Sequence, residues 1–239
     1  MNKKQVGISV VIPTKNEEKY LSRLLDSINR QTYTNFEVLV CDFKSSDKTR
    51  EIAKEKGARV IDVKKRGQSH ARNVGIKNAK GDIIAFIDAD FVLSKGLFED
   101  SVKKMKVDVA AVVPKFSLDV TGVPVSKRGF YSFCLKVDNL WKRMSFHTYN
   151  PRAYGCVFCS AKEVHRAGLF KENLLVSEEP DFYNRLRRNG RFILLRKSAK
   201  LSFRRILKQG LLSAGYIYLK SDLKYYFKAK RVDAMPEIR

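Results

Sequence analysis

The sequence has no run of about 18 apolar residues, the length that a helix needs to cross a bilayer, so it predicts no transmembrane segment. The N-terminal lysines precede only a short apolar stretch that stops at Pro13, whereas a signal peptide needs a longer one. Glu17 and Glu18 follow in place of small cleavage-site residues. We therefore interpret the N-terminal stretch as a first β-strand.

Cysteine is scarce, with four in 239 residues. Cys156 and Cys159 form a C-x-x-C motif, but no second pair and no nearby pair of histidines completes the four ligands of a zinc site. We expect both to be structural, and the low use of cysteine fits a reducing compartment. The G-x-G-x-x-G and G-x-x-x-x-G-K-[ST] loops are also absent, so a bound nucleotide would be held in another way.

Acidic residues number 25 against 48 lysines and arginines, which gives a net charge of +23. Such a surface attracts nucleic acid, acidic lipid headgroups or phosphorylated substrates, or it reflects a generally basic proteome or a means of keeping the protein soluble. The hydrophobic fraction of 44% is sufficient for a core, and the length suits one large α/β domain or one domain with a small appendage.

Short β-branched runs alternate with helical patterns in the first half of the chain. The β-branched runs are Val6–Ile12, Phe36–Cys41, Ala58–Val63 and Asp82–Ile87. Helices are predicted around Leu21–Ile28 and over Lys48–Lys56, Gln68–Ala79, Ala161–Ala167 and Pro180–Asn189. This alternation predicts βαβ units and a parallel sheet. Asp108–Pro114 is a further candidate strand, whereas Phe116–Tyr154 shows no clear pattern.

Polar and acidic side chains stand at the ends of the predicted strands, where ligands of open parallel sheets bind. They are Thr14, Asp42 and the pair in Asp88-Ala89-Asp90. Carboxylates two positions apart on an extended chain point the same way and can converge on one cation. Mg²⁺ or Mn²⁺, completed by diphosphate oxygens and water, is the usual ion of nucleotide sites.

Four segments in this order resemble the motifs of family 2 glycosyltransferases: Ile8–Glu18, Cys41–Thr49, Gly67–Gly75 and Asp88–Asp90. Gly155–Phe170 and Glu178–Arg185 are similar to the segments around the acceptor site of that family. The resemblance implies a GT-A fold, which is a Rossmann-like, mostly parallel sheet flanked by helices. It also implies a metal-dependent enzyme that moves a sugar from a UDP- or GDP-sugar to an acceptor by one direct, inverting displacement.

The resemblance assigns a role to each matching position. Glu179 would be the catalytic base that deprotonates the acceptor. Asp88 and Asp90 would bind the divalent metal (Mg²⁺ or Mn²⁺), with Asp90 favoured as the direct ligand. The residues that would bind the nucleotide sugar are Pro13, Thr14, Glu17, Asp42, Arg72 and Asp88. Two positions depart from the family pattern. Phe43 replaces a common second aspartate, and Glu179 stands where the family usually has an aspartate, so the acidic pair is Glu-Glu and leaves Glu178 as a rival base.

The resemblance divides the chain into a GT-A domain, residues 1–200, and a basic helical tail, residues 201–239. Residues 1–115 would bind the nucleotide sugar and residues 116–200 the acceptor. In the tail, an apolar stripe from Leu219 to Phe227 runs beside lysines, so the tail lies on an anionic membrane surface or packs on the domain. The acceptor is accordingly open, with a polyprenyl-linked or other membrane-associated molecule as one option. We expect a cytoplasmic protein, with peripheral contact at the inner face of the cell membrane left open.

Other interpretations stay open from the sequence alone. A sugar nucleotidyltransferase also uses an α/β nucleotide site with a metal, although Lys15–Glu18 is acidic where that enzyme needs a glycine-rich basic loop. A nucleic-acid-binding protein would explain the charge but not the acids at the strand ends, and we expect no nucleic-acid partner. Asp42 and Asp47 also fit turn and cap roles, and Glu178 and Glu179 the acidic first turn of a helix. Arg204 either meets phosphate or is solvated.

Overall fold

The computed structural model describes residues 7–147, 151–174 and 178–209. The predicted alternation of strands and helices in the first half is confirmed, close to the predicted ranges. The elements are β1 (Ile8–Thr14), α1 (Glu18–Asn29), β2 (Phe36–Asp42), α2 (Thr49–Glu55), β3 (Arg59–Asp62), α3 (Gln68–Asn78) and β4 (Ile83–Ile87).

The second half contains several elements that sequence patterns did not predict. In order, it forms β5 (Phe91–Leu93), α4 (Leu97–Lys104), β6 (Val109–Asp119), α5 (Val125–Ser145), β7 (Cys156–Ser160), α6 (Ala161–Ala167), α7 (Glu178–Arg187), β8 (Arg191–Ser202) and α8 (Arg204–Gln209). Helix α6 has the predicted bounds, and α7 begins two residues before Pro180, which lies in its first turn.

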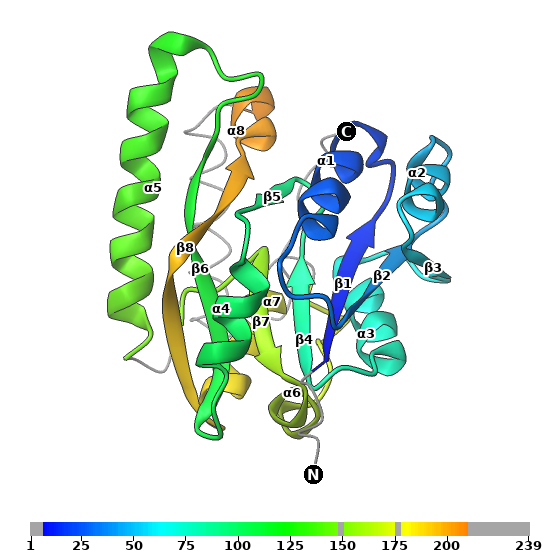
Figure 1. Ribbon diagram of the computed structural model, residues 1–239, viewed down its shortest axis with the longest axis vertical. Coiled ribbons are helices and arrows are strands. Elements are labelled where there is room, and N and C mark those ends of the chain that lie inside the picture. Colours follow the sequence, from blue (N-terminus) through cyan, green and yellow to red (C-terminus); the bar gives the residue numbers. More distant parts are fainter. Residues whose placement is uncertain (1–6, 148–150, 175–177, 210–239) are drawn as a thin grey trace.

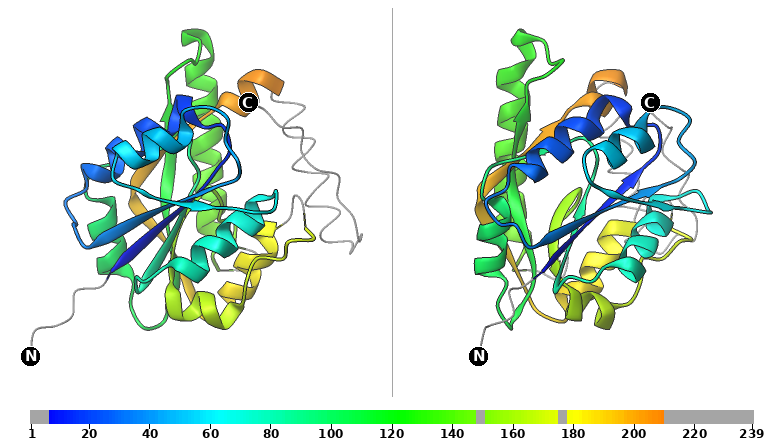
Figure 2. Two further views of the ribbon diagram at one scale, coloured as in Figure 1. Left: turned by 90° about the vertical axis from the view of Figure 1, so that its right-hand side faces the viewer. Right: turned by 45° about the vertical axis from the view of Figure 1, so that its right-hand side comes forward.

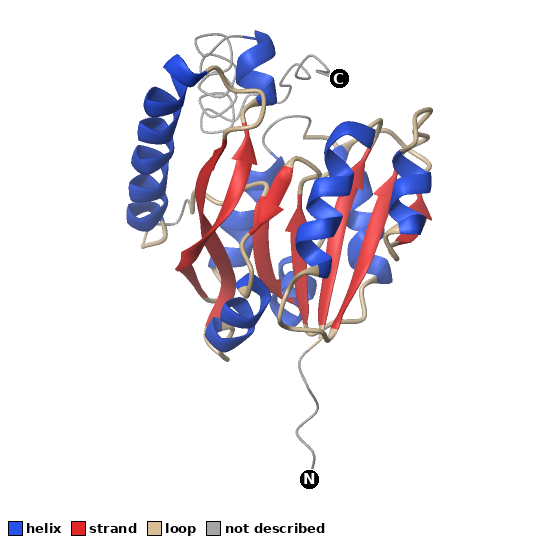
Figure 3. Cartoon of the chain, turned by 45° about the horizontal axis from the view of Figure 1, so that its top comes forward, coloured by secondary structure: helices blue, strands red, loops and turns tan. Residues whose placement is uncertain are grey.

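The strands of the described residues form one eight-stranded sheet in the order β3-β2-β1-β4-β7-β6-β8-β5, with helices on both faces (Figures 1 and 3). Strands β3, β2, β1 and β4 are parallel, as are β6 and β8. Strand β7 is antiparallel to both of its neighbours, and β5 is antiparallel to β8. The predicted α/β class with a mostly parallel sheet is confirmed.

Strand β1 lies within the parallel half of the sheet and contributes side chains to the core on both faces. Val10 and Ile12 pack in the cluster under α1, whereas Val11 packs in the opposite cluster with Ile76 of α3. This alternation follows from the two-residue period of a strand, and burial on both faces explains why β1 is mostly apolar, with only Ser9 and Thr14 polar. The predicted stripe of α1 is buried against the first cluster, at Leu21, Leu24, Leu25 and Ile28.

The C-x-x-C pair lies in β7, between β4 and β6. Cys156 packs in the cluster that contains Val10, and Cys159 packs in the opposite cluster with Val11. Three positions along a strand reverse the side-chain direction, so the two thiols lie on opposite faces of the sheet. Both are fully buried and unbridged, as expected for structural cysteines.

The segment Phe116–Tyr154, which showed no clear sequence pattern, contains the end of β6 and the whole of the 21-residue helix α5. Strand β6 continues beyond Pro114 because β8 pairs with it along its length. The register shifts between Val113 and Lys115, which is where a residue without a backbone N–H is tolerated.

Only the start of the predicted tail falls within the described residues. Leu201 and Ser202 complete β8, and α8 follows. The predicted amphipathic stripe from Leu219 to Phe227 lies outside the described residues. Among the residues that the structure describes, no helix is long and apolar enough to cross a membrane.

Candidate active site

The predicted site residues gather at the carboxyl edge of the parallel strands. Thr14 ends β1 level with Asp42 at the end of β2, and Asp88 follows β4 on the other side of β1. The chain order of the strands reverses at β1, since β2 lies on one side and β4 on the other. This reversal is the place where open α/β sheets bind ligands.

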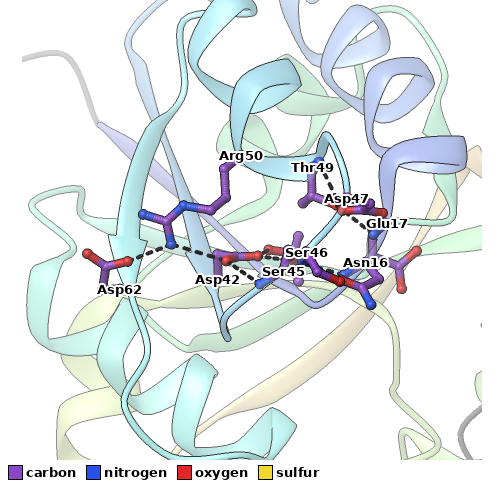
Figure 4. A network of polar contacts seen from close by, with 10 residues as sticks. Asn16, Glu17, Asp42, Ser45, Ser46, Asp47, Thr49, Arg50 and Asp62 are labelled. Atoms are coloured by element: carbon purple, nitrogen blue, oxygen red, sulfur yellow. Dashed lines mark hydrogen bonds and ion pairs between the residues drawn. The ribbon is translucent and has the colours of Figure 1, made fainter.

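Asp42 is fully buried and its carboxylate anchors the β2–α2 loop (Figure 4). Thr14 Oγ1 donates to its Oδ2 at 3.0 Å, and the backbone N–H and the hydroxyl of Ser45 both donate to it. Arg50 Nη1 donates to Asp42 at 3.2 Å and to the exposed Asp62 at 2.5 Å. These are the bonds of a turn residue, so Asp42 organises the loop, and its predicted contact with the base or ribose stays a prediction.

The β1–α1 loop is tied to the β2–α2 loop by reciprocal hydrogen bonds (Figure 4). The N–H of Asn16 donates to Ser45 Oγ at 2.8 Å, and the N–H of Ser46 donates to Asn16 Oδ1 at 2.9 Å. The N–H of Glu17 donates to Thr49 Oγ1 at 2.7 Å. The two loops that would surround a nucleoside are therefore preformed.

Arg72 of α3 lies at the centre of an acidic group on the other side of β1. Its Nη2 lies 3.1 Å from Asp88 Oδ1 and 3.2 Å from Glu179 Oε1, and its Nη1 lies 3.7 Å from Glu178 Oε1. The side chain is 1% exposed. Burial disfavours its charge, yet the carboxylates of Glu179 and Asp88 outweigh burial and raise the pKa of Arg72 above its ordinary value. Arg72 thus connects a candidate donor residue to the candidate base.

Glu178 and Glu179, at the start of α7, differ in their surroundings. Burial raises the pKa of Glu178 to about 7, against the lowering effect of Arg72. Glu178 Oε2 is buried and has no hydrogen-bond partner among the described residues. The Glu179 side chain is 18% exposed, and its Oε1 accepts a hydrogen bond from the N–H of Gly155 at 3.1 Å. Glu179 is the more accessible and the better oriented of the two.

Gly155 is a site residue that the sequence did not single out. Its φ of +64° lies in the left-handed region, and an added Cβ would lie 2.8 Å from Phe91 Cε2. Its carbonyl accepts from the N–H of Asp88 at 2.8 Å while its N–H donates to Glu179. One peptide segment therefore fixes a candidate donor residue and the candidate base. Its position immediately before an apolar strand was the one sequence feature that could have identified Gly155.

Arg204, the first residue of α8, is neither solvated nor distant from the site. Its Nε donates to Asp90 Oδ2 at 2.8 Å, and its Nη1 and Nη2 donate to Glu17 at 2.6 and 2.9 Å. The guanidinium also lies 4.4 Å from the centroid of the Tyr20 ring. Burial opposes its charge, but the hydrogen bonds that it donates to Glu17 and the negative charges of Asp90 and Glu17 outweigh burial and raise the pKa of Arg204. Arg204 therefore bridges one predicted nucleotide residue and one predicted metal ligand.

The two aspartates of Asp88-Ala89-Asp90 lie in a turn between β4 and β5, rather than on an extended strand as expected. Asp88 contacts Arg72 and Asp90 contacts Arg204. No group of three or more histidine, cysteine or acidic side chains within the described ranges is arranged to hold a metal. The donor set still fits Mg²⁺ or Mn²⁺, which in nucleotide sites takes one or two carboxylates and completes its shell with phosphate oxygens and water.

Comparisons with known proteins identify the family and the fold of the chain. Residues 9–160 match the model of glycosyl transferase family 2, so the chain belongs to that family and its sheet is a GT-A fold. Among solved structures, mannosyltransferase PcManGT from Pyrobaculum calidifontis, in complex with GDP-Man and Mn²⁺, superposes with a TM-score of 0.72. It is 21% identical, and the match covers 98% of this chain and 66% of that one.

Two curated relatives resemble the chain over different lengths. Poly(ribitol-phosphate) beta-N-acetylglucosaminyltransferase TarS of Staphylococcus aureus is 28% identical over 234 residues, which are 93% of this chain and 35% of the relative. Its residues 1–349, solved with UDP-GlcNAc, superpose with a TM-score of 0.64 at 24% identity, covering 83% of this chain and 59% of that one. UDP-Glc:alpha-D-GlcNAc-diphosphoundecaprenol beta-1,3-glucosyltransferase WfgD of Escherichia coli is 34% identical over 41% of this chain and 40% of its own. The chain spans about a third to two fifths of these relatives.

Proposed function

We propose that the chain is an inverting glycosyltransferase that moves a sugar from a UDP- or GDP-sugar to an acceptor. The observation that carries the proposal is the buried Arg72, which joins Asp88 on the donor side to Glu179 on the acceptor side. A single displacement requires a donor residue and a base around one reaction centre, and the contacts of Arg72 support these roles for Asp88 and Glu179. Family membership and the GT-A fold support the same reaction.

On the donor side, residues 1–115 supply the nucleotide-sugar site in this proposal. Pro13, Thr14 and Glu17 line the nucleoside side, and Asp42 keeps the adjoining loop in place. Arg72 acts through the carboxylates that it holds, because its guanidinium is buried. Asp88 and Asp90 would hold a divalent cation, which when bound stabilises the negative charge of the departing diphosphate.

On the acceptor side, Glu179 receives the proton of the acceptor hydroxyl while the acceptor oxygen attacks the anomeric carbon. The bond from that carbon to the diphosphate oxygen breaks in the same step, so the configuration inverts. Gly155 N–H and Arg72 orient Oε1 of Glu179 for this role. Glu178 is a weaker candidate because its carboxylate is more deeply buried.

The acceptor in this proposal binds to residues 116–200 and is carried by a polyprenyl lipid. WfgD, whose name specifies a diphosphoundecaprenol acceptor, supports a lipid carrier. A terminal lipid phosphate is already mostly ionised near pH 7, since its second pKa is about 6, and would hardly need a base. A sugar hydroxyl on such a carrier would need Glu179.

Isothermal titration of UDP-, GDP- and TDP-sugars, with Mn²⁺ and with EDTA, tests the donor site. We expect metal-dependent binding of one nucleotide class that is lost in Asp90→Ala. Absence of binding to every donor by folded protein would reject the assignment. Glu179→Gln then tests the acceptor, because a near-total loss of turnover with intact donor binding indicates a hydroxyl, and near-full activity indicates a phosphate.

A further inference from the structure

Helix α5 carries two apolar faces, although it covers only one side of the sheet. Tyr131 and Leu135 point inward and are buried. A second set points outward, with side chains between 47% and 65% exposed: Phe130, Phe133, Val137, Leu140, Trp141 and Met144. Their spacing of three and four residues places them on one stripe of the helix. We call this set the outer stripe of α5.

An exposed stripe of this kind is unusual on a helix that already has a buried face. A surface helix normally turns polar residues outward, and contiguous exposed apolar patches mark interaction sites. Helix α5 stands at the edge of the molecule, outside β6 and β8 (Figures 1 and 2). The described residues leave the outer stripe largely uncovered, since every member remains about half exposed or more.

The exposed charges of α5 itself are all positive. Lys127, Lys136 and Arg143 are exposed on α5. The one acidic residue of the helix, Asp138, is turned inward, where it pairs with Lys142 and Arg152. The exposed face of α5 therefore combines aromatic and aliphatic side chains with lysine and arginine, without an exposed acid.

We propose that the outer stripe of α5 lies on an anionic membrane surface. In this arrangement Phe130, Phe133 and Trp141 enter the boundary between headgroups and acyl chains, and the flanking cations meet acidic headgroups. The net charge of +23 draws the whole chain to the same surface.

Other occupants fit the charges less well. A second copy of the chain would bring two rows of cations together, with no exposed acid on α5 to pair them. Residues 210–239 contain six lysines and arginines against three acidic residues, so they would also add like charge. A membrane with acidic lipid offers negative headgroups for the cations of α5 and an apolar phase for the outer stripe.

The position of α5 is consistent with an acceptor presented at a membrane. Arg152 lies over Trp141 at 4.8 Å from the ring and donates to Asp138 at 2.9 Å. Tyr154 also donates to Asp138, at 2.8 Å, and Gly155 follows it directly. The stripe is thus next to the segment that leads into the candidate site. Membrane contact by the outer stripe does not depend on sugar transfer, and it can be measured without a donor or an acceptor.

Trp141 is the only tryptophan of the chain, so its fluorescence reports on the outer stripe alone. Full-length protein is mixed with vesicles of phosphatidylcholine, with or without phosphatidylglycerol. We expect co-sedimentation and a blue shift of Trp141 emission with the anionic vesicles, both reduced at high salt. Co-sedimentation without a blue shift would overturn the proposal, because another surface would then bind the lipid.

Two variants and a control separate the apolar and charged contributions. Phe133→Gln/Leu140→Gln should lower partitioning at least about tenfold, since two apolar contacts are lost. Lys127→Gln/Lys136→Gln/Arg143→Gln should lower it about a hundredfold, at about a factor of five for each cation. The control removes three exposed lysines elsewhere, as Lys54→Gln/Lys77→Gln/Lys106→Gln, and should have a much smaller effect.

Equal binding by the wild type and both α5 variants would overturn the proposal and return membrane contact to residues 201–239. Sedimentation velocity without vesicles provides a second check. A dimer that dissociates in Phe133→Gln/Leu140→Gln would show that a second copy covers the stripe, and would also overturn the proposal. A monomer in both proteins, together with the vesicle results above, supports it.

Discussion

The guanidinium of Arg204 donates a hydrogen bond of 2.8 Å to the carboxylate of Asp90, from 114 residues farther along the chain. The same group pairs with Glu17, so one cation occupies the space between the nucleoside side and the proposed metal ligands. A positive charge at this place would compete with a divalent cation held by the proposed ligands and would attract the diphosphate of the proposed donor.

Replacing Arg204 with Met should therefore strengthen the binding of Mn²⁺ in the absence of nucleotide. Removing one competing charge near a protein surface is worth roughly 1–2 kcal/mol, or about tenfold in affinity. Titration calorimetry or the electron paramagnetic resonance signal of free Mn²⁺ measures the change. Arg23→Met is the matched control, because Arg23 pairs with Asp119 and not with a proposed ligand. Unchanged Mn²⁺ affinity in Arg204→Met would show that the two cations do not compete.

Gly155→Ala should both destabilise the fold and reduce turnover. The new Cβ would meet the ring of Phe91 and the backbone would be held at a positive φ, for a combined cost of about 2–4 kcal/mol. Gly122→Ala is the control for the backbone cost alone, because Gly122 also has a positive φ, of +73°, but no atom lies near its added Cβ. Urea unfolding of both variants separates the cost of the positive φ from the cost of the contact with Phe91. Equal destabilisation by both variants would show that the Phe91 ring moves aside for the added Cβ at no cost in stability.

The donor half was predictable because its signals are local. Strands β1 and β4 are buried on both faces; β4 is a continuous apolar run, β1 is mostly apolar, and the stripe of α1 has the helical period. The acids at the strand ends followed from the rule that ligands bind there. Their roles as ligands of a nucleotide or a metal stay predictions.

The second half was less predictable for physical reasons. Helix α5 is apolar on its outer as well as its inner face, which obscures the period that identifies an amphipathic helix. Arg204 reaches Asp90 and Glu17 only because β8 returns to this end of the sheet, and no local pattern signals a contact across 114 positions. Gly155 depends on the approach of Phe91, which is likewise a property of the folded chain.

The buried carboxyl of Glu178 should make stability depend on pH. Burial raises its pKa to about 7 in the folded protein, from an ordinary value of 4.5. The folded state then binds more protons than the unfolded state between these values, so this group's contribution to stability falls as pH rises from about 4.5 to 7. Glu178→Gln removes that fall.

Urea unfolding of wild type and Glu178→Gln at pH 5 and pH 8 measures this contribution. The variant should gain on the order of 2 kcal/mol relative to the wild type between the two pH values. Donor binding should be retained, since Asp88 and Glu179 still neutralise Arg72. A constant difference between the two proteins at both pH values would contradict a raised pKa.

Replacing Asp138 should destabilise the fold much more than replacing its ion-pair partner Lys142. Lys142 is fully buried, with Nζ 2.8 Å from Asp138 Oδ2 and 3.1 Å from the centroid of Phe116. Asp138→Asn leaves the buried ammonium without its counter-ion and should cost about 3–5 kcal/mol. Lys142→Met fills a similar volume and leaves Asp138 with Arg152 and Tyr154, so it should cost about 1 kcal/mol or less.

Stability measured against pH gives an independent check on Lys142. Burial lowers the pKa of Lys142 to about 8, from an ordinary value of 10.5. Between these values the unfolded state binds more protons, so the stability of the wild type should rise with pH relative to Lys142→Met. Urea unfolding at pH 7.5 and pH 10 compares the two proteins. If their difference does not change, the ammonium keeps its proton over this range and the strong attraction of Asp138 outweighs burial.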